Sequence, residues 1–294
     1  MHEAMFWAAA ENGAAHCSLC PHNCRIPEGR AGLCGVRRNI GGRLYAESYG
    51  KVSAVALDSI EKKPLYLFHP GKRVLSIGSF GCNLRCPFCQ NSDISMEYEK
   101  AWRDAQTLTP EDVAALAAKT VPRGNIGVAY TYNEPLIGYE FVRGCARLVR
   151  KAGLRNVLVT NGYVHREPLE ALLPLVDAMN IDLKGFTPGF YKKLCGGLET
   201  VKGTIALAHP LCHVEITCLV IPGENDSEEE IAALAQWIAS LDPGIPLHLT
   251  RFFPRYQYAH RAATPRGKVL LLSEVAGRYL KHVFTGNMGG SSNV

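Results

Sequence analysis

Short β-rich runs alternate with amphipathic helical segments from about residue 73 onward. Strands that alternate with helices at this spacing indicate a parallel sheet joined by right-handed crossovers. Six such units favour an α/β fold built as a partial (β/α)6 TIM-like barrel over an open doubly wound sheet, although the pattern alone does not separate the two. The expected strands are 73–79, 125–131, 156–160, 178–183, 213–220 and 246–252.

The helical segments carry recognisable ends. Residues 108–120 begin with Thr109 as the expected N-cap and Pro110 at the first helical position, and residues 135–153 present one apolar face and end at Gly153. Further helices are expected at 167–176, 188–195 and 227–241. The tail GGSSNV, residues 289–294, has low complexity and is expected to be disordered.

Polar segments follow five of the expected strands. In chain order they are GCNLRC, YNEP, NGY, DLKG and IPGEND. Because the loops at the carboxyl ends of parallel strands converge on one mouth, we expect these segments to line a single cavity. The alternative is that loops between strands and helices are polar in every α/β protein.

Composition narrows the class of protein. The chain has 294 residues, 47% of them hydrophobic, and a formal net charge of +5 without any block of like charges. It contains no run of the roughly 18 apolar residues that a membrane-spanning helix needs, and its N-terminus lacks a basic region ahead of an apolar stretch. We therefore expect a cytoplasmic protein with neither a membrane nor a nucleic acid as partner.

Eleven cysteines are unusual for such a chain. In a reducing compartment they favour metal binding or catalysis over a disulfide framework. Four isolated cysteines are interpreted as ordinary buried small residues: Cys145, Cys195, Cys212 and Cys218. The other seven form two clusters, Cys17, Cys20, Cys24 and Cys34, then Cys82, Cys86 and Cys89.

The second cluster has the pattern CxxxCxxC. Three thiolates at this spacing let one loop wrap a face of a four-iron cubane, which ordinarily takes four. One iron then lacks a protein ligand, and an open position distinguishes a reactive metal site from a structural one. Zinc is the alternative, but a closed zinc site needs a fourth ligand, and the loop from Ser79 to Asn91 offers no His, with only Asp93 just beyond.

At these residues the chain resembles the radical S-adenosylmethionine (SAM) superfamily. The motif is CNLRCPFC, residues 82–89, with Phe88 as its aromatic position. The resemblance implies that Cys82, Cys86 and Cys89 hold a [4Fe-4S] cluster whose fourth iron is chelated by SAM. It also implies an electron donor such as a flavodoxin or ferredoxin, cleavage of SAM to a 5′-deoxyadenosyl radical, and abstraction of hydrogen from a substrate.

Other loops offer groups for binding SAM. Asn133 and Glu134 in TYNEP can accept from its ammonium, although Glu134 is also a candidate helix first-turn acid. Asp182 and Lys184 in NIDLKGF lie two apart on a strand and thus on one side, where they can serve the ribose and the carboxylate. The alternative for this pair is a plain salt bridge.

Three weaker candidates follow. Asn161 in VTNGY is a possible ribose contact, or part of a turn at Gly162. Ile221 and Pro222 flank the adenine or belong to the core. His69, His248 and Arg251 lie near the expected mouth and are unspecific candidates for substrate contact.

Several motifs together resemble a narrower group, the activating-enzyme-like radical SAM enzymes of the AmmeMemoRadiSam system, related to the pyruvate formate-lyase activating enzyme. They are residues 59–91, TYNEP, NIDLKGF, FYKKLCGG and VEITCLVIPGEND. The resemblance implies a small-molecule substrate, with Memo-like and Amme-like proteins as partners, or else a glycyl radical enzyme as protein substrate. A hypothesis from another class is a non-catalytic zinc-binding scaffold.

The first cysteine cluster, CSLCPHNCRIPEGRAGLC, marks a separate N-terminal region. Four cysteines at this spacing can close a tetrahedral zinc site or hold a second iron–sulfur cluster, and the spacing does not choose between them. Zinc would clamp a small domain, whereas an iron–sulfur cluster can relay electrons. His16 and His22 are spare ligands that we expect to be solvent-exposed. The expected organisation is a Cys-rich region at 1–58, the barrel at 59–288 and the tail.

Overall fold

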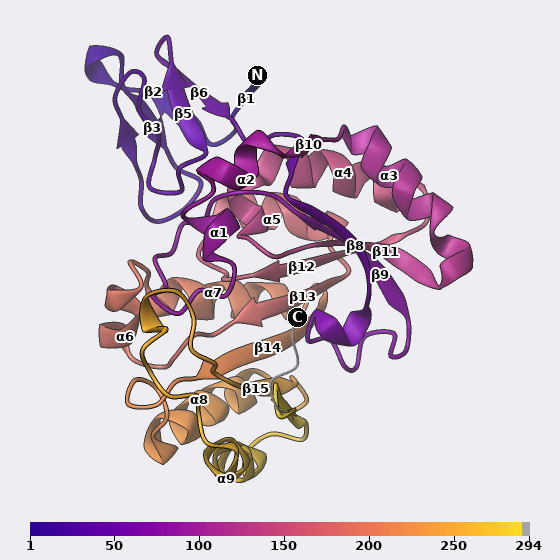
Figure 1. The fold of residues 1–294 in the computed structure, drawn as a ribbon, viewed down its shortest axis with the longest axis vertical. Helices are drawn as coiled ribbons and strands as arrows, with labels where there is room; N and C mark the ends of the chain where they lie inside the picture. Colours follow the sequence, from indigo (N-terminus) through magenta and orange to yellow (C-terminus); the bar gives the residue numbers. More distant parts are fainter. Residues whose placement is uncertain (290–294) are drawn as a thin grey trace.

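An eight-stranded sheet forms the largest part of the computed structural model, which describes residues 1–289 (Figure 1). Its strand order is β16-β15-β14-β13-β12-β11-β9-β8. The strands are β8 (Ala54–Ser59), β9 (Arg73–Gly78), β11 (Asn125–Tyr130), β12 (Arg155–Thr160), β13 (Ala178–Asp182), β14 (His213–Val220), β15 (Leu247–Arg251) and β16 (Val283–Gly286).

The strands from β9 to β16 pair in parallel, and only β8 runs antiparallel, alongside β9. Their order follows the sequence without reversal, so successive right-handed crossovers place their helices on the same face. Within residues 1–289 the edge strands β8 and β16 do not pair with each other, so the sheet stays open. The α/β fold and the parallel sheet are confirmed, and all six expected strands are present within two residues of their expected ends.

The expected helices are also present. Thr109 caps α3 through a reciprocal pair of hydrogen bonds with Asp112, and Ser227 caps α8 by accepting from the Glu230 N–H. Two long helices that the pattern did not predict, α7 and α9, complete the layer. The helices longer than one turn are α2 (Glu99–Arg103), α3 (Pro110–Lys119), α4 (Tyr139–Lys151), α5 (Arg166–Leu172), α6 (Pro188–Lys193), α7 (Leu198–Ala208), α8 (Glu228–Leu241) and α9 (Arg266–Gly277).

The face of the sheet away from the helices is filled only near the amino ends of its strands. There Val74, Ala129, Val157 and Ala178 pack against Ile60 and Leu65 from the segment after β8. Glu215 of β14 fixes that segment, since it accepts hydrogen bonds from the N–H groups of Tyr66 (2.9 Å) and Leu67 (2.8 Å). The carboxyl ends of the same strands are left free to line a cavity.

The N-terminal region forms two small antiparallel sheets at one end of the molecule (Figure 1). Their strands are β1 (His2–Glu3), β6 (Arg43–Ala46) and β5 (Arg37–Ile40), then β2 (Trp7–Ala9), β3 (Ala15–Cys17) and β4 (Arg25–Ile26). A further pair joins β7 (Lys51–Val52) to β10 (Gln106–Thr107). The large sheet already begins at Ala54, ahead of the expected boundary at 58–59; of the expected tail, residues 290–294 lie outside the described residues.

A buried ion pair holds the N-terminal region against the helix layer. Arg37 Nη1 lies 3.0 Å from Glu140 Oε1 of α4, and both side chains are 2% exposed. The same carboxylate accepts from the Met5 N–H at 2.6 Å. Removing one partner of a buried pair leaves an uncompensated charge away from water, so this contact is costly to break.

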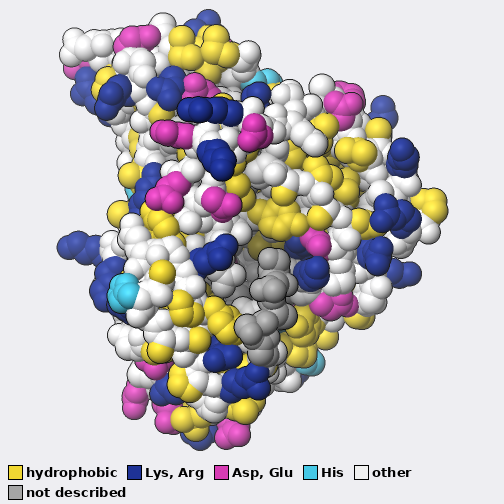
Figure 2. All heavy atoms as spheres, viewed as in Figure 1, with side chains coloured by type: hydrophobic (Ala, Val, Ile, Leu, Met, Phe, Trp, Pro, Cys, Tyr) yellow, Lys and Arg dark blue, Asp and Glu magenta, His cyan; other side chains and the backbone are white. Residues whose placement is uncertain are grey.

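The surface shows no concentration of charge that would indicate a polyanionic partner on the face seen in Figure 2, where basic and acidic side chains are interspersed. No helix among the described residues combines the length and the apolar character needed to cross a bilayer.

We predict that Glu140→Gln lowers the free energy of unfolding by about 3 kcal/mol or more, because Arg37 keeps its charge without a buried carboxylate. The matched control is Glu170→Gln, which removes the exposed pair Arg166–Glu170, with side chains 75% and 45% exposed, and should cost no more than about 0.5 kcal/mol. Thermal unfolding followed by circular dichroism measures both. Equal shifts of the midpoint in the two variants would contradict the docking role of Glu140.

Candidate functional site

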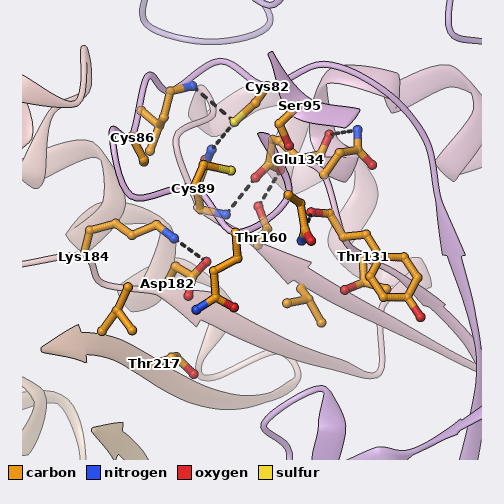
Figure 3. Close-up of a pocket in the computed structure, with 18 of the residues that line it drawn as sticks. Cys82, Cys86, Cys89, Ser95, Thr131, Glu134, Thr160, Asp182, Lys184 and Thr217 are labelled. Carbon is orange, nitrogen blue, oxygen red and sulfur yellow. Dashed lines mark hydrogen bonds and ion pairs between the residues drawn. The ribbon is translucent and has the colours of Figure 1, made fainter. Parts of the chain in front are cut away.

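A pocket of about 390 Å³ opens at the carboxyl ends of the parallel strands (Figure 3). Four of the five polar segments contribute to its lining as predicted, whereas the fifth, IPGEND at residues 221–226, does not. Loops or ends of β9, β11, β12, β13, β14 and β15 all contribute to its lining. The residues that argue for a function are Cys82, Cys86, Phe88, Cys89, Asn133, Glu134, Asn161, Asp182, Lys184 and Thr217.

Three thiols share one wall of this pocket. Cys82, Cys86 and Cys89 all come from the loop after β9 and are gathered on one side of the view in Figure 3. The Cys82 sulfur accepts from the Leu84 N–H at 3.4 Å and from the Asn161 side-chain amide at 3.6 Å. Such donors stabilise a thiolate, which is the form of cysteine that binds metals.

Burial keeps these thiols neutral in the metal-free chain. It raises the pKa of Cys86 to about 12 and also raises the pKa of Cys89. The Lys184 ammonium acts in the opposite direction on both residues. A metal that binds here displaces the thiol protons, because cysteine binds metals as the thiolate. The three thiols and the cavity in front of them therefore fit an iron–sulfur cluster. Among residues 1–289, no three His, Cys, Asp or Glu side chains already meet at the distances of a single bound ion.

Asp182 and Lys184 lie on the same side of the chain, as the sequence predicts. Their Oδ2 and Nζ atoms are 2.7 Å apart, with side chains 29% and 18% exposed. Although burial lowers the pKa of Lys184, Asp182 and the neighbouring thiols outweigh it, and the net pKa is raised. Asp182 and Lys184 thus form the salt bridge that was the alternative to a SAM-binding role. Both residues also line the pocket (Figure 3).

Glu134 is tied into the protein on both oxygens. Its Oε1 accepts from the Thr160 hydroxyl (2.6 Å) and the Leu136 N–H (3.0 Å), and its Oε2 accepts from the Asn161 N–H (2.7 Å). The alternative role as a helix-capping acid is therefore present. Because a carboxylate oxygen has two lone pairs, Oε2 keeps one acceptor position, and Glu134 lines the pocket. Burial raises the pKa of Glu134 to about 7.

Asn133 and Asn161 also serve the loops around the pocket. Asn133 accepts from the Ser79 N–H at 2.9 Å and donates to the carbonyls of Phe80 and Gly81. Asn161 accepts from the Tyr163 N–H at 2.8 Å, which is the turn expected as the alternative. Both side chains therefore hold the loops in place and also line the pocket.

Phe88 is buried and lines the pocket beside the thiols, with its ring stacked parallel to Phe190 at a centroid distance of 6.2 Å. It holds the loop against α6. Phe88, the aromatic residue of the motif, therefore forms part of the pocket wall.

Several weaker candidates do not reach the pocket. Ile221 is fully buried, so the core interpretation applies to it. His248 is buried below the pocket, where its Nε2 lies 2.6 Å from Glu215 Oε2. Arg251 donates to the Thr264 carbonyl, and His69 is exposed. Neither these residues nor Pro222 are among the described residues that line the pocket, so substrate contacts from the His and Arg residues stay a prediction.

The sequence reasoning missed one group of pocket residues. Lys63 donates to Asp58 Oδ2 at 2.8 Å, and the Tyr132 hydroxyl donates to the same oxygen at 2.8 Å. Burial alone raises the pKa of Asp58, but these hydrogen bonds outweigh it and bring the pKa to about 2. Lys62, Lys63 and Tyr132 line the pocket. Lys63 lies before β9, in the run EKKP. A prediction that considers only the segments after each strand therefore cannot find it.

The four N-terminal cysteines line a second, much smaller cavity of about 10 Å³. His22 is half-buried there and donates from Nε2 to the Asn83 carbonyl at 2.7 Å, so the expectation of an exposed His22 is wrong. The expectation for Cys195 is also wrong, since that thiol is exposed. Cys145 and Cys218 are buried, as expected.

Comparison with known proteins agrees with this geometry. Residues 76–235 match the family model of the Radical SAM superfamily. The chain belongs to the radical SAM superfamily. It is 40% identical to the uncharacterized protein MJ0808 of Methanocaldococcus jannaschii, over 99% of this chain and 86% of that protein. It is 28% identical to the pyruvate formate-lyase 1-activating enzyme of Escherichia coli strain K12, over 57% of this chain and 69% of that enzyme.

The fold is shared with solved structures. A radical SAM methyltransferase from Sphaerobacter thermophilus superposes with a TM-score of 0.54 at 16% identity, covering 76% of this chain and 68% of that protein. QueE from Escherichia coli superposes with a TM-score of 0.51 at 15% identity, covering 80% of this chain and 92% of QueE. The family model and the sequence relatives confirm the resemblance to activating-enzyme-like radical SAM enzymes, and the protein is an enzyme rather than a non-catalytic scaffold. A [4Fe-4S] cluster and SAM are the cofactors that the superfamily implies.

We predict a pH-dependent contribution of Glu134 to stability. The pKa of Glu134 is about 7 in the folded chain, above its ordinary value of 4.5. Between pH 4.5 and pH 7 the folded chain therefore keeps the carboxyl proton, whereas the unfolded chain has lost it. Stability therefore falls as pH rises from about 4.5 to about 7, by up to ~3 kcal/mol, and is level above that. Urea unfolding of the metal-free chain between pH 5 and pH 8 should show this slope in the wild type and not in Glu134→Gln. The same slope in both proteins would contradict the assignment.

Proposed function

We propose that this enzyme cleaves SAM reductively at a [4Fe-4S] cluster held by Cys82, Cys86 and Cys89. The observation that carries the proposal is the three thiols on one wall of a pocket whose other walls are the strand-end loops. When bound, the cluster supplies the electron that converts SAM to methionine and a 5′-deoxyadenosyl radical, which takes hydrogen from the substrate. The part of this chain is to bind, orient and shield these groups.

The side chains around the thiols match the polar groups of SAM. The Lys184 ammonium offers a charge-assisted hydrogen bond to the methionine carboxylate, and Glu134 Oε2 has one acceptor position for the ammonium. Asp182 and Asn161 offer partners for the ribose hydroxyls, as does Thr217, which lies opposite Asp182 on the neighbouring strand β14. Phe88 closes the pocket behind the thiols and keeps water from that wall.

We infer that the substrate is a small molecule. The pocket of about 390 Å³ must hold the cluster and SAM as well as the substrate, and this limited space favours a compact substrate. Beyond the groups assigned to SAM, the lining ends in Lys62, Lys63, Tyr132 and Thr250, which are polar partners for a compact substrate. We further propose that the open sheet is a partial (β/α)6 barrel and that the enzyme is cytoplasmic. Its electron donor would be a flavodoxin or ferredoxin, and its partners Memo-like and Amme-like proteins.

A protein substrate is the second candidate function. Its support is the 28% identity to the pyruvate formate-lyase 1-activating enzyme over 57% of this chain, whose name describes action on another enzyme. An open sheet offers a lateral entrance that a polypeptide loop can use.

We predict that Cys86→Ala abolishes SAM cleavage, because two thiolates do not retain the cluster. The matched control is Cys145→Ala, a buried cysteine on α4 outside the pocket lining, which should cleave SAM at nearly the wild-type rate. The measurement is formation of 5′-deoxyadenosine and methionine after anaerobic reconstitution with iron, sulfide, dithionite and SAM. Equal loss in both variants would show that the site has been misplaced.

The substrate class is tested with a cell extract split by ultrafiltration. We expect the low-mass fraction to raise the rate of 5′-deoxyadenosine formation several-fold over the background without substrate, and the protein fraction to leave it unchanged. Stimulation by the protein fraction alone, lost after proteolysis, would contradict the small-molecule proposal and support the activase.

A further inference from the structure

A lysine is buried in the wall of the main pocket. Lys63 follows the short turn after β8, lines the pocket and is 3% exposed. Among the described residues, Asp58 alone accepts a hydrogen bond from the Lys63 ammonium, from Nζ to Oδ2 at 2.8 Å. Because an ammonium has three donors, two donors of this buried group are available to a ligand in the pocket.

The charges around Lys63 do not cancel. Lys62 Nζ lies 3.6 Å from Asp58 Oδ1, so two lysines share one carboxylate. The Lys62 side chain is 71% exposed and also lines the pocket, which places it at the rim. Burial lowers the pKa of Lys63 in spite of its contact with Asp58, and the Lys62 charge acts in the same direction. This end of the pocket therefore carries an excess positive charge that an anion would balance.

Tyr132 holds Asp58 and Lys63 in place. Its hydroxyl donates to Asp58 Oδ2 at 2.8 Å, and Lys63 Nζ lies 4.5 Å from the centre of its ring. The backbone of Tyr132 has a φ of 73°, which a bulky residue rarely adopts. Gly78 leaves room for the ring, because a Cβ there would lie 2.8 Å from the Tyr132 Cδ2. Backbone strain of this kind persists where the surrounding contacts over-determine it, and it gathers at functional sites.

SAM does not supply the balancing anion. Its one anionic group is the methionine carboxylate, which Lys184 is proposed to bind. The Lys184 charge also lowers the pKa of Cys86 and Cys89, so this lysine acts on the wall that carries the thiols. Figure 3 shows Lys184 and Thr131, the residue before Tyr132, on opposite sides of the pocket. The charge at Lys63 therefore faces a different ligand.

We propose that the substrate is a small acidic metabolite whose oxyanion, a carboxylate or a phosphate, binds Lys63 inside the pocket and Lys62 at its rim. In this role, which depends on the proposed function, the free Nζ donors of Lys63 form charge-assisted hydrogen bonds to the oxyanion. Because Asp58 and Tyr132 already fix the ammonium, the substrate is oriented by a group that does not need to move. A neutral metabolite of the same size would leave the Lys63 charge uncompensated.

The first test is binding to the full-length chain, which requires no SAM cleavage. The probes are succinate and inorganic phosphate, with uncharged succinamide as the matched neutral compound, and titration of the thermal midpoint measures binding. We expect at least one oxyanion to raise the midpoint and succinamide to leave it unchanged. Binding of succinate alone identifies a carboxylate site, and binding of phosphate alone a phosphate site.

Lysine variants assign the binding to this end of the pocket. Lys63→Met removes the charge and should weaken oxyanion binding about ten-fold or more. The control is Lys119→Met, an exposed lysine at the end of α3, which should bind as the wild type does. If Lys63→Met does not fold, the exposed Lys62→Met replaces it and should weaken binding about two- to five-fold. Equal binding by the wild type and the pocket variant, or no binding of either oxyanion, would overturn the proposal.

The second test passes the low-mass fraction of a cell extract over an anion-exchange resin. The retained compounds should raise the rate of 5′-deoxyadenosine formation several-fold in the wild type and in Lys119→Met, relative to the background of each protein without substrate. Lys63→Met should lose this ratio. Stimulation by the unretained compounds alone would overturn the acidic substrate. Absence of background cleavage in the wild type would instead refute the proposed function, and the binding test would still decide the oxyanion site.

Discussion

The structure depends on the placement of one loop, between Ser79 and Asn91, at the edge of a parallel sheet. This loop has little secondary structure of its own, and amide side chains anchor it from both sides. Asn133 binds the backbone of Ser79 and Gly81, and Asn91 donates to the Tyr132 carbonyl at 2.8 Å. Because Asn133 and Tyr132, which make these contacts, both lie directly after β11, the thiols are positioned by the sheet itself. A loop set in this way holds three sulfurs toward a cavity without a fourth ligand from the chain.

The electrostatics of the site follow from burial. Burial in the wall favours the neutral forms of the thiols and of the Glu134 carboxyl group, as the raised pKa values of Cys86 and Glu134 indicate. Lys184 opposes this by favouring thiolates nearby, and Asp182 keeps that lysine charged. The thiols of the pocket therefore become charged when a metal binds, whereas Lys184 and Asp182 form an ion pair there already.

Much of this could be predicted from the sequence. The six strands were found because both of their faces are covered, which leaves continuous apolar runs between polar turns. Thr109 and Pro110 gave the start of α3 through capping chemistry that is local. Since parallel strands place their carboxyl ends together, the motif after β9 and the pair Asp182 and Lys184 could be assigned to one cavity before any geometry was known.

The remainder needed three dimensions. The N-terminal strands are two to four residues long, too short for a periodic pattern. Lys63 reaches the pocket from before the first parallel strand, paired with Asp58. Asn133 braces a loop 53 residues away in sequence, which no local pattern encodes. The exposure of Cys195, at a positive φ of 56°, likewise depends on a turn that its neighbours do not announce.

The central claim is that one iron at the pocket has no protein ligand and is reserved for SAM. Electron–nuclear double resonance of the reduced enzyme, with SAM labelled with ¹⁵N at its amino group and ¹⁷O at its carboxylate, tests it most directly. The account predicts hyperfine coupling from both labels, which only direct coordination to iron produces. Absence of coupling, together with a spectrum that SAM leaves unchanged, would contradict it.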